Sequence, residues 1–251
     1  RYATAGFDPN DLGLTLALAV PMVLYLASRV TRTWKWTVWL SGFLVVAAVL
    51  LTASRMALVV AAVGFLFSAL TWREASAGQR ILSLRLFSAL AAGALWLAPP
   101  ASRERLAKLQ TELTRGTLHY RTHIWKAGLK ALKRHPLLGA GAGAYPDAVY
   151  PWLGRPGIAG HQYTAHNTFL SVLVETGLTG AACFGLLLLT LAGFIWMMRA
   201  SERALWLTTF LMWAIGVFTL TWEHRKPTWL LFALILTAWA RAFEPPEEER
   251  A

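Results

Sequence analysis

Two arginines and one histidine in this chain combine reactive side chains with positions where apolar segments end. Arg55 separates two long apolar runs, Arg121 lies in an amphipathic segment, and His166 precedes a helix start. A guanidinium matches a phosphate or carboxylate bidentately, and an imidazole exchanges a proton near neutral pH. These residue types suit anion binding next to a proton transfer. The alternatives are an arginine that only reaches the membrane surface, for Arg55, and a structural histidine, for His166.

The sequence gives less support to other chemistries. The motifs GxSxG and HExxH are absent, and the outer face offers no DxD-type carboxylate pair that would hold a sugar-nucleotide metal. His119 and His123 are spaced i and i+4 but have no obvious third ligand, so no metal site is predicted. The single cysteine, Cys183, excludes an intramolecular disulfide. The glycine-rich stretch 139–143 matches no phosphate-binding motif, so a tight turn is favoured there over an anion cradle.

The composition is that of a membrane protein. Of the 251 residues, 56% are hydrophobic and only 15% are charged, and the mean hydropathy is +0.46. Disorder is excluded by this apolar content. A net charge of +11 would suit a nucleic-acid-binding protein, but a soluble one would not carry so many unbroken apolar runs, so nucleic acid is not an expected partner.

Seven low-charge apolar runs predict seven transmembrane helices, because 16 to 21 residues at about 1.5 Å each match the hydrocarbon core of a bilayer. The predicted fold class is therefore all-α, a polytopic helical membrane protein, with one membrane domain over residues 1–251. The chain begins at Arg1 without a signal peptide, and we expect a fragment that lacks N-terminal spans. The runs are 12–28, 37–53, 56–72, 81–98, 178–198, 204–222 and 228–243.

Lysine and arginine in the short loops predict the orientation of these helices. The loops 29–36, 73–80 and 199–203 carry such residues and are assigned to the cytoplasm, as is the acidic tail 244–251. The long segment 99–165 then lies outside the cytoplasm. This segment is itself strongly basic, and it calls for an anionic partner such as lipid headgroups or a phosphate-bearing substrate.

Two helices are predicted around this long loop. Residues 117–135 form an amphipathic helix that stops before Pro136, and Arg121 falls within its apolar stripe. The stripe is Leu118, Trp125, Leu129 and Leu132, and the polar side is His119, His123, Lys126, Lys130, Lys133 and Arg134. The lysines can simply face lipid phosphates, whereas Arg121 needs a partner within the protein or substrate. A second helix opens at Asn167 or Thr168, and Gly177 is expected to end it.

Four segments together resemble the O-antigen ligase and polymerase superfamily of bacterial membrane enzymes. They are GFDPNDLG at 6–13, SR at 54–55, RTHIWKAGLKALKRHPLLGAGAGAY at 121–145 and AHNTFLSVLVETGLTG at 165–180. The resemblance implies a GT-C-like fold with further N-terminal spans, in the bacterial inner membrane. It also implies an active site on the periplasmic side and transfer of glycan from undecaprenyl diphosphate without a metal or cofactor.

The resemblance also implies roles for particular residues. Arg55 and Arg121 would bind the diphosphate, His166 would be the catalytic base, and Asn167 and Glu175 would help to orient it. The favoured function is an O-antigen ligase acting on lipid A-core. The alternatives are an O-antigen or exopolysaccharide polymerase, a protein O-oligosaccharyltransferase and, outside enzymes, a small-anion transporter. The implied partners are the undecaprenyl-diphosphate-linked glycan donor, the lipid A-core or glycan acceptor, and membrane lipids.

Overall fold

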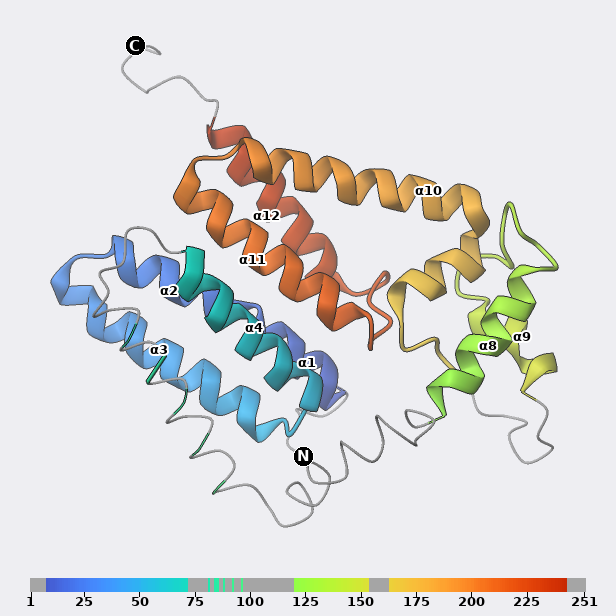
Figure 1. The fold of residues 1–251 in the computed structure, drawn as a ribbon, viewed down its shortest axis with the longest axis horizontal. Helices are drawn as coiled ribbons and strands as arrows, with labels where there is room; N and C mark the ends of the chain where they lie inside the picture. Colours follow the sequence, from blue (N-terminus) through green and yellow to red (C-terminus); the bar gives the residue numbers. More distant parts are fainter. Residues whose placement is uncertain are drawn as a thin grey trace. The chain divides into compact units, whose positions relative to one another are not determined.

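The computed structural model describes residues 8–71, 120–153 and 163–242, together with a few isolated helical positions between 81 and 96. Every regular element in these ranges is a helix (Figure 1), which confirms the all-α class. The chain forms two compact units. The first comprises Arg1–Ala98, Thr190–Gly216 and Lys226–Ala251, and the second comprises Pro99–Leu189 and Val217–Arg225.

The first unit is a helical bundle. Asp8 caps its first helix, since Asp8 Oδ1 accepts a hydrogen bond of 2.7 Å from the Asn10 N–H and Pro9 occupies the first turn. Gly13 lets this helix approach Thr52 and Ala57 closely, as small residues do between membrane helices. The elements of this unit are α1 (Pro9–Ala17), α2 (Ala19–Arg29), α3 (Arg32–Leu51), α4 (Arg55–Thr71), α11 (Ala200–Val217) and α12 (Lys226–Ala242).

A tight turn joins α3 to α4, as the sequence predicts near Arg55. The Thr52 hydroxyl donates to the Val49 carbonyl at 2.7 Å and accepts from the Ser54 N–H at 3.3 Å. Ala53 takes a left-handed backbone with φ 50°, and Ser54 Oγ accepts from the Ala57 N–H at 3.4 Å. Since these contacts end one helix and start the next, Arg55 becomes the first residue of α4.

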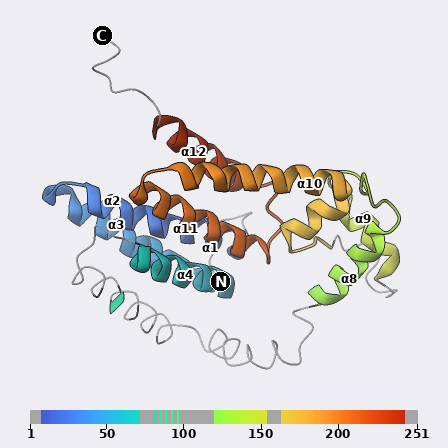
Figure 2. The same cartoon turned by 45° about the horizontal axis from the view of Figure 1, so that its top comes forward.

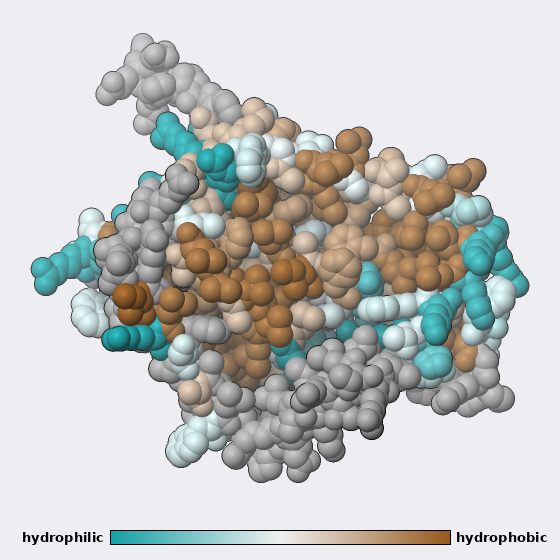
Figure 3. Space-filling view, viewed as in Figure 1, coloured by the Kyte–Doolittle hydropathy of each residue, from teal (hydrophilic) through white to brown (hydrophobic). Residues whose placement is uncertain are grey.

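Three helical stretches in the described residues are long and apolar enough to cross a membrane, namely Pro9–Arg29, Arg32–Leu51 and Thr168–Met197. Helix α4 is apolar but shorter. Large apolar side chains remain exposed on α3 and α10, among them Leu40, Phe43, Leu186 and Leu189, and Figure 3 shows how much of one face of the protein is hydrophobic. Such an apolar surface is expected where lipid surrounds a protein.

The helix ends depart from the apolar runs at two places. Helix α11 ends at Val217, although the run continues to 222, because Thr168 binds the backbone of Leu220 and Trp222 outside any helix. Helix α10 (Thr168–Met197) begins before its run and changes direction at Gly177, where φ is 67° (Figures 1 and 2). The predicted span 81–98, the loop parts 99–119 and 154–162, and the tail 244–251 lie outside the continuously described ranges.

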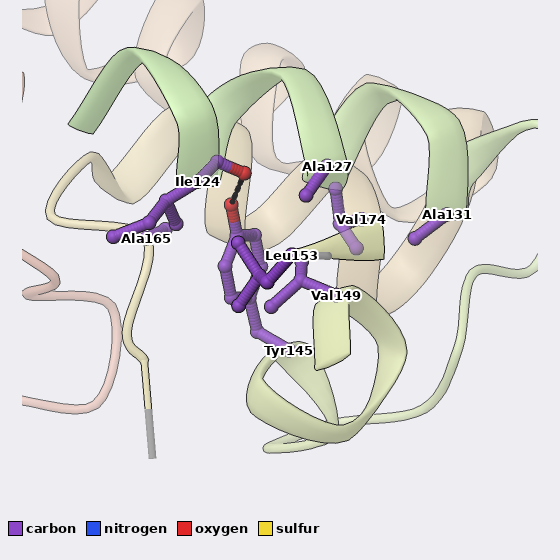
Figure 4. Close-up of a cluster of buried hydrophobic side chains, with 8 residues drawn as sticks. All are labelled: Ile124, Ala127, Ala131, Tyr145, Val149, Leu153, Ala165 and Val174. Carbon is purple, nitrogen blue, oxygen red and sulfur yellow. Dashed lines mark hydrogen bonds between the residues drawn. The ribbon is translucent and has the colours of Figure 1, made fainter. Parts of the chain in front are cut away.

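The second unit has a core between α8 (Arg121–Leu132), α9 (Tyr145–Val149), the short helix η1 (Tyr150–Trp152) and the first turns of α10. Tyr145 lies at its centre and donates a hydrogen bond of 3.2 Å from its hydroxyl to the Ile124 carbonyl (Figure 4). The other core side chains are Ala127, Ala131, Val149, Leu153, Ala165 and Val174.

The predicted apolar stripe of the helix over 117–135 is wrong in detail. The buried residues of α8 are Ile124, Ala127, Gly128 and Ala131, whereas Leu129 is 49% exposed. Small residues are favoured on the buried face because Gly128 sits directly against the Tyr145 ring. The helix also ends at Leu132, and Arg134 and His135 follow in tighter turns before Pro136.

Candidate functional site

His166 is held in an unusual conformation at the start of α10. Its φ is 45°, a left-handed value that costs a residue with a Cβ about 1–3 kcal/mol and that occurs often at active sites. The next residue, Asn167, caps the helix through its Oδ1, which accepts from the Leu170 N–H at 3.0 Å. The predicted helix start at Asn167 or Thr168 is confirmed, and it fixes the position of the half-buried imidazole.

Helix α8 is tied to the segment that carries His166. The Trp125 indole N–H donates a hydrogen bond of 2.8 Å to the carbonyl of Ala165, the residue before His166. Arg121 lies one turn before Trp125, in line with the buried Ile124 and Gly128. The half-buried Arg121 side chain therefore starts on the inner face of α8, and the second unit brings the segments of Arg121 and His166 together.

Tyr120, which precedes Arg121, also has a left-handed backbone, with φ 71°. Its ring stacks on His123 with centroids 4.7 Å apart and lies 6.4 Å from the Tyr163 ring. The aromatic contacts thus connect the start of α8 to the segment that leads to His166. Thr164 Oγ1 in that segment lies 3.5 Å from His166 Nε2.

Glu175 fastens the glycine-rich loop 139–143. Its carboxylate accepts from the Gly143 N–H at 2.8 Å and from the Tyr145 N–H at 3.4 Å, and its backbone carbonyl accepts from the Gly141 N–H at 2.8 Å. The Ala140 N–H donates to Val174 in the same way. Because these amides bind α10, the loop is a structural turn, as predicted, and not an anion cradle.

Two ionisable residues that the sequence analysis did not single out complete this region. His224 Nε2 lies 3.4 Å from Glu175 Oε2 and 3.9 Å from Glu223 Oε1. The His224 side chain is 60% exposed, while both glutamates are buried. Burial raises the pKa of Glu223, and the Glu175 carboxylate adds to this effect, whereas Ser171 and His224 lower the pKa. In the sequence, the run of charged residues that follows Trp222 is the feature that could have pointed to Glu223 and His224.

Within the described ranges, Glu175, Glu223 and His224 are the group whose geometry could admit a metal ion, with ligand atoms within 4.8 Å of one another. Two carboxylates and an imidazole suit a divalent transition metal. Glu175 Oε2, however, already accepts the Gly143 N–H, so its main role here is to hold the loop.

The structure distributes the predicted site residues over both units. Arg121, His166, Asn167 and Glu175 belong to the second unit, and Arg55 is the half-buried first residue of α4 in the first unit. Asn167 acts as a helix cap, and Glu175 contacts the loop and His224. A cavity lined by Tyr25, Ser68 and Ser201 lies in the first unit, and no predicted site residue lines it.

Fold and site together define an all-α membrane protein. Its second compact unit carries Arg121 and His166 on two segments that the hydrogen bond from Trp125 to Ala165 joins. The chain belongs to the O-Antigen ligase family, whose model matches residues 40–185, more than half of the sequence. The exopolysaccharide production protein ExoQ of Rhizobium meliloti (strain 1021) is 37% identical over 83 residues, which are 30% of this chain and 18% of that protein. Members of the family are glycosyltransferase-like membrane enzymes of glycan assembly.

Proposed function

We propose that the protein transfers a glycan from undecaprenyl diphosphate to a hydroxyl acceptor at the periplasmic face of a bacterial inner membrane. The observation that carries the proposal is the tie between Trp125 and Ala165, which holds the start of α8 beside the strained His166. A cation for the diphosphate and a base for the acceptor are the two groups that this reaction needs. Membership of the O-Antigen ligase family supports the same assignment.

In the proposed reaction the acceptor hydroxyl attacks the anomeric carbon of the first donor sugar. The bond between that carbon and the diphosphate oxygen breaks, and the hydroxyl proton passes to His166. The diphosphate leaves with the bonding electrons, and Arg55 and Arg121 stabilise its growing charge through charge-assisted hydrogen bonds. The attack and departure occur on opposite faces, so the configuration at the anomeric carbon is inverted. Two guanidinium groups take the place that a divalent metal occupies in many phosphate-transfer enzymes.

The favoured acceptor is lipid A-core, which makes the protein an O-antigen ligase. A second candidate is a polymerase that extends an exopolysaccharide chain, and the similarity to an exopolysaccharide production protein favours it. The same catalytic groups serve both reactions, since both acceptors offer a hydroxyl. Assays with both acceptors are therefore needed.

The test uses the full-length protein in a bacterial strain without its own ligase, with lipopolysaccharide separated on a gel. We expect the wild type to restore glycan-capped lipid A, and His166→Ala and Arg121→Ala to fail at normal expression. Lys126→Ala is the matched control for Arg121→Ala, because it removes an exposed cation from the same helix. Wild-type activity in either site variant would refute the assigned role. Failure of the wild type would favour the polymerase, to be tested in a strain that lacks its exopolysaccharide polymerase.

Two further measurements test the chemistry. Arg121→Lys is expected to be nearly as inactive as Arg121→Ala, because an ammonium group cannot bind two phosphate oxygens in a planar fork. EDTA is expected to leave transfer by the purified protein unchanged. Loss of activity in EDTA, with recovery in magnesium or manganese, would contradict the metal-free reaction and direct attention to Glu175, Glu223 and His224.

A further inference from the structure

The turn that follows α8 lies at the membrane boundary of α10. The 20 residues from Leu178 to Met197 contain no charged side chain, and Glu175 and Arg199 flank them. At about 1.5 Å per residue this stretch is roughly 30 Å long, which is the thickness of the hydrocarbon core. Leu178 therefore marks the level at which α10 enters the hydrocarbon.

Hydrogen bonds join the turn after α8 to α10 at this same level. The Leu178 N–H donates to the Pro136 carbonyl at 2.9 Å, and the Thr179 N–H donates to the Leu137 carbonyl at 3.1 Å. The Thr179 hydroxyl adds a bond of 2.7 Å to the Leu137 carbonyl. The side chains of Leu137 and Leu138 are 61% and 77% exposed. Their exposure is explained if they enter the edge of the hydrocarbon.

Cationic side chains lie three and four positions before Leu137. Lys133 and Arg134 are exposed. Because at most four positions separate them from Leu137, their Cα atoms lie at most about 14 Å from the Leu137 Cα atom. The Arg134 guanidinium lies 4.7 Å and the Lys130 ammonium 5.8 Å from the centre of the Trp152 ring. Hydrophilic side chains gather over α8 and this turn in Figure 3. In the parts of the chain that the structure covers, no carboxylate forms an ion pair with these three cations.

We propose that Lys130, Lys133, Arg134, Leu137 and Leu138 form an interfacial surface that binds the phosphate headgroups of anionic phospholipids in the surrounding bilayer. The leucines enter the hydrocarbon edge, and the cations lie at the level of the phosphates. Two observations favour an anionic phospholipid as the ligand. The exposed side chains are cationic, and hydrogen bonds hold the turn at the level where α10 enters the hydrocarbon. The arginine binds a phosphate diester bidentately, while the lysines act as point charges.

The experiment measures local lipid composition at Leu138. The full-length protein carries Leu138→Cys with an environment-sensitive fluorophore in a Cys183→Ala background, which removes the natural cysteine. It is placed in nanodiscs of phosphatidylcholine that contain a small share of nitroxide-labelled phosphatidylglycerol or nitroxide-labelled phosphatidylcholine. We expect the anionic lipid to quench the fluorophore more strongly. Equal quenching by the two lipids would overturn the proposal.

Lys133→Gln and Lys126→Gln are the matched pair, because both remove one exposed lysine from the same short segment. Lys133→Gln should weaken the local association of phosphatidylglycerol about fivefold, the usual effect of one cation beside an anionic lipid surface. Lys126→Gln should change it much less, and equal effects of the two variants would contradict the assigned surface. Displacement of the labelled lipid by undecaprenyl diphosphate but not by unlabelled phosphatidylglycerol would also overturn the proposal, in favour of a donor site.

Discussion

The loop 139–143 should depend on the Glu175 carboxylate in a graded way. Glu175→Ala removes the acceptor of the Gly143 N–H, which lies 2.8 Å away, and of the longer bond from Tyr145. A hydrogen bond to a charged group contributes about 1.5–3 kcal/mol, so local opening should become roughly 10- to 150-fold more frequent. Glu175→Gln keeps a neutral acceptor, so the closed loop should lose about 1–1.5 kcal/mol of stability. Local opening should then become roughly 5- to 15-fold more frequent.

Amide hydrogen exchange of the full-length protein in nanodiscs, followed by mass spectrometry of the peptide over 139–145, measures this effect. Asp147→Asn is the matched control, since it removes an exposed carboxylate from the neighbouring α9 and should leave the exchange unchanged. Unchanged exchange in Glu175→Ala would refute the role of the carboxylate. An equal increase across α8 and the loop would refute a local role, since Glu175 would then stabilise the whole unit.

Three other substitutions probe neighbouring contacts. The pKa of Glu223 is raised above 4.5, so the stability that depends on its neutral form is present below pH 4.5 and is lost as the pH rises through the raised value. As the pH rises from 4.5, the melting temperature of Glu223→Gln should therefore fall less than that of the wild type. Parallel curves of melting temperature against pH would contradict the raised pKa. Thr168→Val leaves the Trp222 N–H without its acceptor, at a cost of about 1–3 kcal/mol, so exchange over 218–225 should increase; wild-type exchange there would exclude the role of the hydroxyl. Gly177→Ala places a Cβ against the Leu137 carbonyl in a positive-φ conformation that alone costs about 1–3 kcal/mol, and a thermal melt that matches the wild type would contradict this close approach.

Local rules account for the features that the sequence predicts correctly. The cap at Asn167 depends on residues only a few positions away, and so does the turn before Arg55. Long apolar runs identify membrane helices for the same reason, because bilayer thickness acts on each helix separately.

Features that depend on distant contacts were not predictable in this way. The inner face of α8 is set by Tyr145, whose ring favours Gly128 over a leucine at the closest contact. The pairing of Glu175 with His224 joins segments that most of α10 and all of α11 separate along the chain. Neither contact leaves a periodic signal along the chain. The roles of Arg55, Arg121 and His166 stay predictions that the proposed transfer assays test.

Gly139 and Gly177 interlock in a way that affects how mutational tolerance should be interpreted. A Cβ on Gly139 would meet the Glu175 carbonyl, and a Cβ on Gly177 would meet that of Leu137. If Arg121 and His166 have the proposed roles, a scan of all substitutions scored by glycan output would rank these two glycines beside them, although neither glycine has a side chain that can react. Intolerance to substitution in this stretch therefore marks two kinds of position, those with reactive groups and those where only a hydrogen atom fits.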